Sequence, residues 1–397
     1  MPLTLDDLRR YAVARSLFPP TTLTRAVRKL GFVQADPIRA PARAQDLILR
    51  LRVRGYRAGD LEKKYPALPI EEDFFVNHGF VTSAVWALMH PREVAPRWRG
   101  GRLRHAEDLL AFVRERRRVH PRDVEERFAR GNVVNAWGGS SKFTTDLLVD
   151  MHYRGWLRVV GRDGGIRVYG ARDRLSSADD VSSLDSAARE ARIDALVDVA
   201  VQTYAPLTGL GLARLVRRLR YAVPQWQREL GRAIVRARER LGHAQVDGLD
   251  WYWPAGERPA FAEPPMEVRL LAPFDPVVWD RDRFELFWGW AYRFEAYTPA
   301  PQRKLGYYAL PLLWGDRVLG WTVLSLVEGR LAPRFGYVAG RAPRDAAFRP
   351  GLEAELARMR AFLGVRDPNT AQKPEPAGRD GRSPSHHPSV GGRGPEP

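Results

Sequence analysis

The sequence predicts an α+β protein with tandem winged-helix modules, a C-terminal antiparallel β-barrel-like domain and a disordered tail. Three observations lead to this fold class. Helices followed by a short β-hairpin, which together make a winged helix, occur twice between residues 96 and 262. Beyond residue 263, short aromatic and β-prone runs are broken by Asp, Gly and Pro. From residue 367 onward, Pro, Gly, Ser and His dominate.

The first module is expected at residues 1–95. Leu5, Leu8 and Tyr11 fall at helical spacing, and "PPTTLTRAVRKLG" supplies a cap, a second helix and a terminating Gly31. A further helical run, "APARAQDLILRLRV", follows. We interpret this block as a third copy of the module with a degenerate wing.

The second module is expected at residues 96–178. The segment "HPRDVEERFA" places Pro121 early in a helix, where proline is tolerated. A longer helix follows in "SSKFTTDLLVDMHYRGWL", with Ser140 or Ser141 as its cap. The apolar face of that helix is expected to contain Leu147, Leu148 and Met151. Alternating strands in "LRVVGRDGGIRVYGA", turning at the double glycine, supply the wing.

The third module is expected at residues 179–262. There "IDALVDVAVQTY", "TGLGLARLVRRL" and "PQWQRELGRAIVRARERLG" predict helices, and "HAQVDGLDWYWP" predicts a wing. In residues 263–366, runs such as "DRDRFELFWGW" and "YYALPLLWGDRVLGW" predict a small antiparallel barrel with a hairpin turn at "WGDRVLG". The helix "LEAELARMRAFLG" closes this domain, and residues 367–397 are expected to be disordered.

Composition narrows the class of protein. The 397 residues carry 64 basic and 47 acidic side chains, a net charge of +17, which attracts polyanions such as nucleic acid. The absence of cysteine excludes disulfides and thiolate metal sites. The start "MPLTLDDLRR" does not look like a signal peptide, and "YYALPLLW" is too short to span a bilayer. We therefore expect a cytoplasmic, nucleoid-associated protein that does not bind membranes.

Several kinds of site lack their sequence signatures. There is no GxSxG elbow, and "GGSSK" lacks the spacing of a phosphate-binding loop. The eight histidines are scattered and include no HExxH motif. We expect neither a metal nor a cofactor.

A candidate catalytic pair lies in "LGFVQADPI". Pro37 disfavours a helical conformation at Asp36, so this segment is expected to be extended. In an extended chain Gln34 and Asp36 point to the same side. The amide can orient a water that the carboxylate activates, or the carboxylate can stabilise a developing sugar cation, as in glycoside hydrolysis. On spacing alone, an ordinary polar turn is the alternative.

Other polar groups are candidates for contact with DNA. The run "RERRRVHPR" at 114–122 is interpreted either as a set of phosphate contacts or as a solvated helix end. Small polar groups at the start of the candidate recognition helix suit phosphate oxygens or simply cap the helix. These groups are Ser140, Ser141, Lys142, Thr144 and Thr145. Arg39 and Arg43 either approach phosphates or are surface charges.

Two stretches resemble the YcaQ/AlkZ-type bacterial DNA glycosylases. "LGFVQADPI" with "ARAQDLILRLRVRGY" is similar to the family's extended Q-apolar-D motif, Ala-Arg helix and following Tyr. "LLAPFDPVVWDRDRFELFWGWAYRFEAYTPAPQRKLGYYALPLLWGDRVLGW" resembles its C-terminal block almost run for run. The resemblance spans nearly the whole chain except the tail. It implies three winged-helix modules and a C-terminal β-barrel.

The resemblance also implies an activity. The expected function is hydrolysis of the N-glycosidic bond of alkylated purines, mainly N7-alkylguanine, in double-stranded DNA, and unhooking of interstrand crosslinks. Gln34 and Asp36 match the catalytic pair. Asn77 of "FFVNHGF" and Tyr297 and Arg303 of the C-terminal block join the candidate DNA contacts. A monomer is expected.

This sequence departs from the family pattern at Pro37, Gln45 and Trp321, which bears on lesion preference more than on fold. The alternative from another class is a non-catalytic winged-helix DNA-binding protein or transcriptional regulator. Such a protein usually needs a base-reading helix and a dimer on a palindromic site. No obvious dimerisation helix is present in the sequence.

Overall fold

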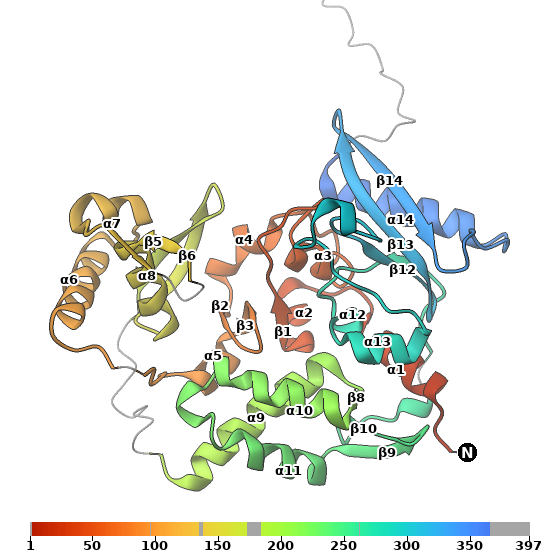
Figure 1. The fold of residues 1–397 in the computed structure, drawn as a ribbon, viewed down its shortest axis with the longest axis horizontal. Helices are drawn as coiled ribbons and strands as arrows, with labels where there is room; N and C mark the ends of the chain where they lie inside the picture. The colour runs from red at the N-terminus through yellow and green to blue at the C-terminus, as the bar shows by residue number, and fades with distance from the viewer. Residues whose placement is uncertain (1, 96, 135–137, 173–183, 262, 366–397) are drawn as a thin grey trace, which may run out of the picture.

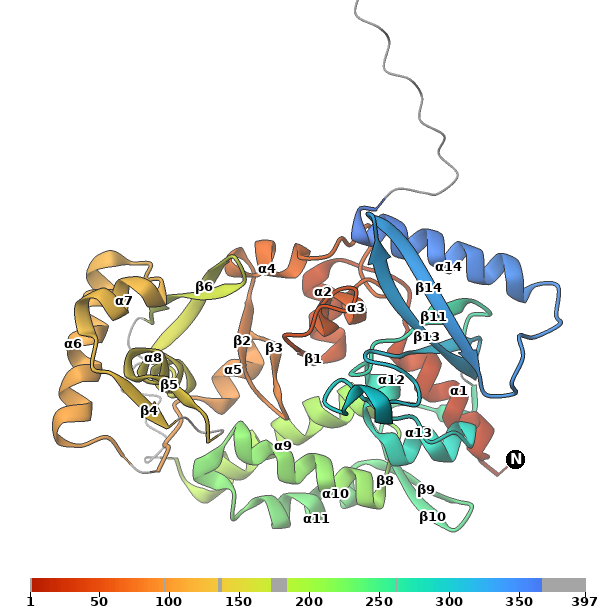
Figure 2. The same cartoon turned by 45° about the horizontal axis from the view of Figure 1, so that its top comes forward.

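A computed structural model describes residues 2–95, 97–134, 138–172, 184–261 and 263–365. Helices and small antiparallel sheets alternate along the chain, so the α+β class is confirmed. In both views the unit around α6–α8 lies at one end and the sheet that contains β13 and β14 lies at the other (Figures 1 and 2). Between them lie α2, α3 and β1–β3, with α9–α11 along one side. The tail at 367–397 lies outside the described residues.

The first unit combines five α-helices with a three-stranded sheet. Its elements are α1 (Leu5–Ser16), α2 (Leu23–Leu30), β1 (Phe32–Gln34), α3 (Ala44–Leu49), α4 (Asp60–Lys64), β2 (Ile70–Phe74), β3 (His78–Thr82) and α5 (Ser83–Met89). The sheet order is β1-β3-β2, with all pairs antiparallel. The two helices expected before Gly31 are confirmed. The run after Arg43 stays helical only to Leu49, because Val53 bridges to Thr21 instead.

The second unit has a similar order of helices and hairpin. Its elements are α6 (Gly100–Arg116), α7 (Pro121–Phe128), β4 (Asn132–Val134), β5 (Ser140–Lys142), α8 (Phe143–Tyr153), β6 (Leu157–Asp163) and β7 (Ile166–Ala171). Pro121 is the first residue of α7, and the buried face of α8 contains the three apolar residues expected there. The expected serine cap is wrong, since Ser140 and Ser141 pair with β4 and the helix begins at Phe143.

The third unit repeats the strand order of the first. Its elements are α9 (Ser186–Tyr204), β8 (Leu207–Thr208), α10 (Gly209–Arg218), α11 (Leu230–Arg240), β9 (Gly242–Val246) and β10 (Leu249–Trp253). The sheet order β8-β10-β9 corresponds to β1-β3-β2 in the first unit. The wing expected in "HAQVDGLDWYWP" is present as a hairpin of β9 and β10. Naming these units winged helices, with boundaries after residues 95, 178 and 262, stays a prediction.

The C-terminal part is an open sheet, so the β-barrel expectation is wrong. Its elements are β11 (Val268–Leu270), α12 (Pro276–Trp279), α13 (Arg281–Trp288), β12 (Leu310–Trp314), β13 (Arg317–Val327), β14 (Arg330–Tyr337) and α14 (Phe348–Leu363). Within 263–365, the described residues of this part, the strands pair only in the order β11-β12-β13-β14, and α14 packs on β11 at the edge, so the sheet does not close. The run "DRDRFELFWGW" is largely helical because the side chain of Asp280 caps α13. The turn between Trp314 and Arg317 is confirmed.

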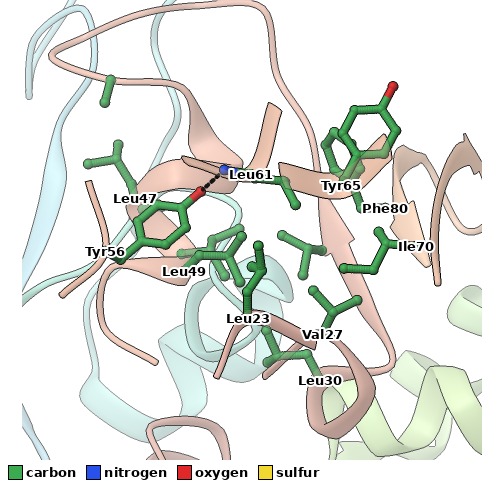
Figure 3. Close-up of a cluster of buried hydrophobic side chains, with 14 of the residues drawn as sticks. Leu23, Val27, Leu30, Leu47, Leu49, Tyr56, Leu61, Tyr65, Ile70 and Phe80 are labelled. Carbon is green, nitrogen blue, oxygen red and sulfur yellow. Dashed lines mark hydrogen bonds between the residues drawn. The ribbon is translucent and has the colours of Figure 1, made fainter. Parts of the chain in front are cut away.

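A buried cluster holds the first unit together. Leu23, Val27 and Leu30 of α2 face Leu47 and Leu49 of α3, with further apolar groups from β2 and β3 (Figure 3). Tyr56 belongs to this cluster, and its hydroxyl oxygen accepts a hydrogen bond from the Leu61 N–H at 3.0 Å. These contacts fix the segment between α2 and α3, which carries the candidate catalytic pair. Among the described helices, none is long and apolar enough to cross a bilayer.

Candidate active site

Strand β1 fixes the position of Gln34. Helix α2 ends at Gly31, whose φ of 84° reverses the chain into β1. Gln34 pairs with Gly79 of β3, where a Cβ would lie 2.3 Å from the Val33 carbonyl oxygen. Only glycine permits this close approach. The Ala35 N–H donates to the His78 carbonyl at 3.0 Å, so the extended backbone continues toward Asp36, as the sequence predicts.

The Gln34 side chain is held by a tryptophan from the C-terminal part. Trp279 Nε1 donates to Gln34 Oε1 at 3.0 Å, and Gln34 is 4% exposed. An indole nitrogen can only donate, so the amide oxygen must face Trp279. The Gln34 amide nitrogen is thereby left to donate to another group. Gln34, Trp279, Asn77 and Phe274 line a cavity of about 330 Å³.

Asp36 lies two residues farther along the extended chain and is 9% exposed. Its carboxylate accepts the Ile38 N–H at 2.9 Å, and its own N–H donates to Gln45 Oε1 at 3.3 Å. Burial raises the pKa of the Asp36 carboxyl and outweighs the opposite effect of the hydrogen bond from Ile38. No cation pairs with Asp36 among the described residues. It is therefore a nearly buried acid with acceptor capacity to spare.

Aromatic rings connect Asp36 with the cavity that contains Gln34. Phe274 packs against Phe294 at 5.0 Å between ring centroids, and Phe294 contacts Tyr297 and Tyr308. Burial, and then the negative charge of Asp36, raise the pKa of both tyrosines. The Tyr308 hydroxyl is buried without a hydrogen-bond partner in the described part of the chain. Aromatic faces of this kind attract cations, including cationic bases.

Three arginines and two aspartates, Asp280 and Asp282, line this cavity, so its charged groups leave one net positive charge. Arg214 and Arg218 of α10 line it, together with Arg281. Arg214 pairs with Asp282 at the surface, whereas the Arg218 guanidinium lies over the Trp279 ring at 5.5 Å. No carboxylate pairs with Arg218 within the described ranges. This charge can face the phosphates of a bound strand.

The buried acid has a consequence for stability. Because the Asp36 pKa is raised above its ordinary 3.8, folding disfavours the ionised carboxylate. That part of the stability is full below pH 3.8 and is lost as pH rises through the raised folded pKa. We expect Asp36→Asn to unfold at higher urea than the unmodified protein at pH 7, with the difference vanishing near pH 3.8. Equal midpoints at pH 7 would contradict the buried, unpaired carboxylate.

The structure places the other predicted contacts unevenly. Asn77 and Gln34 line the same cavity. Tyr297 is 77% exposed and lies close enough to Asp36 to feel its negative charge. Arg303 donates to the Thr298 carbonyl at 2.7 Å and lies over Tyr307. Arg39 is exposed, and its guanidinium lies near Gly165 of the β6–β7 turn.

Five of the predicted contacts have partners within the protein or lie away from the catalytic pair. Arg43 is paired with Glu62, and Thr144 is buried with its hydroxyl on Glu125. Lys142 lies 3.3 Å from Glu125. Ser140 and Ser141 lie on β5 in the second unit, with Ser140 exposed. Contact of these residues with DNA stays a prediction, and for Arg43 and Thr144 it requires exchange of the present partners.

Sequence reasoning missed Trp279, Tyr308 and Gln45 as site residues. Trp279 and Tyr308 both lie in the C-terminal stretch that resembles the glycosylase family, which was a usable signal. Gln45, one of the departures, binds the backbone of Asp36 directly. Trp321, another departure, stacks on Trp290 at 5.6 Å and donates to the Leu305 carbonyl. Among the described residues, no group of His, Asp and Glu is arranged to hold a metal ion.

Comparisons with known proteins concern the family and the fold. The family model described as "DNA glycosylase AlkZ-like" matches residues 27–362. Among solved structures, the chain is similar to the DNA glycosylase AlkZ of Streptomyces sahachiroi, with a TM-score of 0.57 and 15% sequence identity. The match covers 92% of this chain and 98% of that one. At this identity the structural match supports the fold, while the family match includes both Gln34 and Asp36.

Proposed function

The chain belongs to the AlkZ-like DNA glycosylase family, and from that premise we propose that it is a monofunctional glycosylase that removes N7-alkylated purines from double-stranded DNA. The observation that carries this proposal is the pair formed by Gln34, oriented by Trp279, and the nearly buried, unpaired Asp36. The proposal includes the finer assignment of the helix-and-hairpin units as winged helices that hold the duplex.

The proposed reaction needs no strong acid. Alkylation at N7 makes the purine cationic, so its N9–C1′ bond breaks with the electron pair returning to the base. The ionised Asp36 carboxylate stabilises the developing positive charge on the sugar and takes a proton from the attacking water. The free N–H of Gln34 donates to that water and holds it at C1′. The surrounding aromatic rings favour a cationic base over a neutral one.

A single assay separates this function from the alternative. Duplex DNA containing 7-methylguanine is incubated with excess protein, and the free base is measured over time. Base release supports the glycosylase. A footprint on one specific operator without release from any alkylated duplex would support a regulator instead. The same assay with a crosslinked duplex, followed on a denaturing gel, tests whether crosslinks are unhooked.

Trp279 is expected to act as a positioning residue. We expect Trp279→Phe to slow base release by up to about tenfold, the loss from one neutral hydrogen bond, because the Gln34 amide can then rotate. DNA affinity should remain unchanged. Single-turnover rates with saturating protein measure the effect.

The matched control is Trp288→Phe, at the end of the next helix, α13. It removes an indole donor from the Asp316 carbonyl in the β12–β13 turn. This control is expected to keep the full rate. Equal slowing of both variants, with equal losses of stability, would mean that Trp279 serves only the fold.

A further inference from the structure

A second cavity, away from Gln34 and Asp36, has walls rich in arginine. It lies where the loop after α3 meets β11 and α14, and its volume is about 560 Å³. We name it the arginine pocket after five of its lining residues: Arg50, Arg54, Arg57, Arg269 and Arg358. These residues come from three segments far apart in the sequence, so folding assembles the cluster.

Two of the guanidinium groups, those of Arg269 and Arg50, have N–H donors that lack a hydrogen-bond acceptor among the described residues. Arg269 is 7% exposed, and within the described part of the chain its one hydrogen-bond acceptor is Glu267, at 3.3 Å. Burial lowers the pKa of Arg269. Arg50 has a side chain that is 3% exposed, and its Nε is buried without a partner among the described residues. Because a guanidinium carries five N–H donors, Arg269 retains most of its donor capacity.

The nearby acids do not balance this charge. Glu355 is fully buried and bonds to Arg50 at 2.6 Å, to Arg358 at 3.0 Å and to the Leu270 N–H. Its oxygens are therefore already occupied. With Glu267 included, five guanidinium groups face two carboxylates and leave three positive charges. Arg54 and Arg57 are exposed.

We propose that the arginine pocket binds a phosphate group. Planar guanidinium forks match the oxygens of a phosphate, and several converge here from different directions. The volume is in the range of cavities that hold small ligands. The phosphate can come from the backbone of bound DNA or from a free polyphosphate. Gln45 beside Asp36 and Arg50 at the pocket are five positions apart along α3 and its C-cap, about 7.5 Å of helix.

The first arm of the test uses inorganic pyrophosphate as the probe. Isothermal titration of the full-length protein is expected to show one binding site. Arg54→Ala and Arg269→Gln are each expected to bind about tenfold more weakly, the loss of one charge-assisted hydrogen bond. The matched control, Arg349→Ala, removes the same charge from α14 at a side chain that is 88% exposed and outside the pocket. It should bind pyrophosphate normally.

The second arm measures the affinity for unmodified duplex DNA at several salt concentrations. If the pocket holds a backbone phosphate, Arg54→Ala reduces the slope of log K against log salt by about 1, and Arg349→Ala does not. Pyrophosphate binding with unchanged DNA slopes identifies a free phosphate ligand. Absence of pyrophosphate binding, with equal DNA slopes in all variants, overturns the proposal. Neither arm requires base release, so the result is independent of the proposed glycosylase activity.

Discussion

Asp36→Asn is expected to lower the single-turnover rate of 7-methylguanine release by about 10²- to 10³-fold. Asparagine keeps the size and the Ile38 hydrogen bond of the carboxylate but carries no negative charge. It can neither stabilise the sugar cation nor accept the proton of water. Since the group is 9% exposed and no cation pairs with it among the described residues, its replacement should leave the protein surface and the DNA affinity unchanged.

The control for this variant is Asp282→Asn. Asp282 lines the cavity that contains Gln34 but pairs with Arg214 at the surface. The Asp282→Asn substitution makes the same change of charge in the same region, and we expect this variant to release 7-methylguanine at nearly the full rate. If Asp36→Asn retains the wild-type rate at unchanged DNA affinity, the catalytic assignment is wrong. If both variants slow equally, a general change of potential explains the effect.

The two expected results for Asp36→Asn point in opposite directions. The variant is expected to be more stable at pH 7 and to be nearly inactive. Both results follow from one fact, the burial of a carboxylate without a cation beside it. A merely structural acid would have been given a partner, as Asp275 and Glu355 have been. The cost in stability is therefore an argument for a catalytic role.

Local sequence signals predicted much of the fold. Apolar spacing located α1, α2 and α8, and the double glycine at 164–165 located the β6–β7 turn. These features depend on neighbours within a few residues. The failures at Ser140–Lys142 and at α13 have the same origin. Serines can cap or pair, and aromatic runs suit either a strand or a helix, so tertiary pairing and the Asp280 cap decided the outcome.

The candidate site was predictable only in part. The Q-apolar-D spacing and Pro37 indicated Gln34 and Asp36 from local geometry. The contact between Trp279 and Gln34 joins residues 245 positions apart, and no local pattern specifies it. The Arg43–Glu62 pair likewise depends on how α4 packs beside the start of α3. Periodicity predicts which elements form, whereas side-chain partners depend on how those elements meet.

One long-range pair lies at the start of the helix that ends at Trp279, and breaking it is expected to have the largest effect on stability. Asp275 accepts hydrogen bonds from Arg52 at 2.8 and 3.0 Å, and both side chains are fully buried. Its carboxylate also accepts the Val277 N–H at the start of α12, the helix that ends at Trp279. We expect Asp275→Ala to lower the free energy of unfolding by about 3–5 kcal/mol, because Arg52 is left charged and unpaired. Urea unfolding followed by tryptophan fluorescence measures the loss.

Two further variants show whether the buried charge is the cause. Asp316→Ala breaks the ion pair between Asp316 and Arg9, in which both side chains are 19% exposed. This loss should cost no more than about 1 kcal/mol. Adding Arg52→Met to Asp275→Ala should recover part of the loss, since no uncompensated charge then remains. Without recovery, the loss belongs to the α12 cap and to the Ser16 and Ile48 carbonyls that Arg52 binds. In either case Asp275→Ala should slow base release even at urea concentrations too low to unfold the variant. The reason is that α12 no longer holds the Trp279 indole against the Gln34 amide.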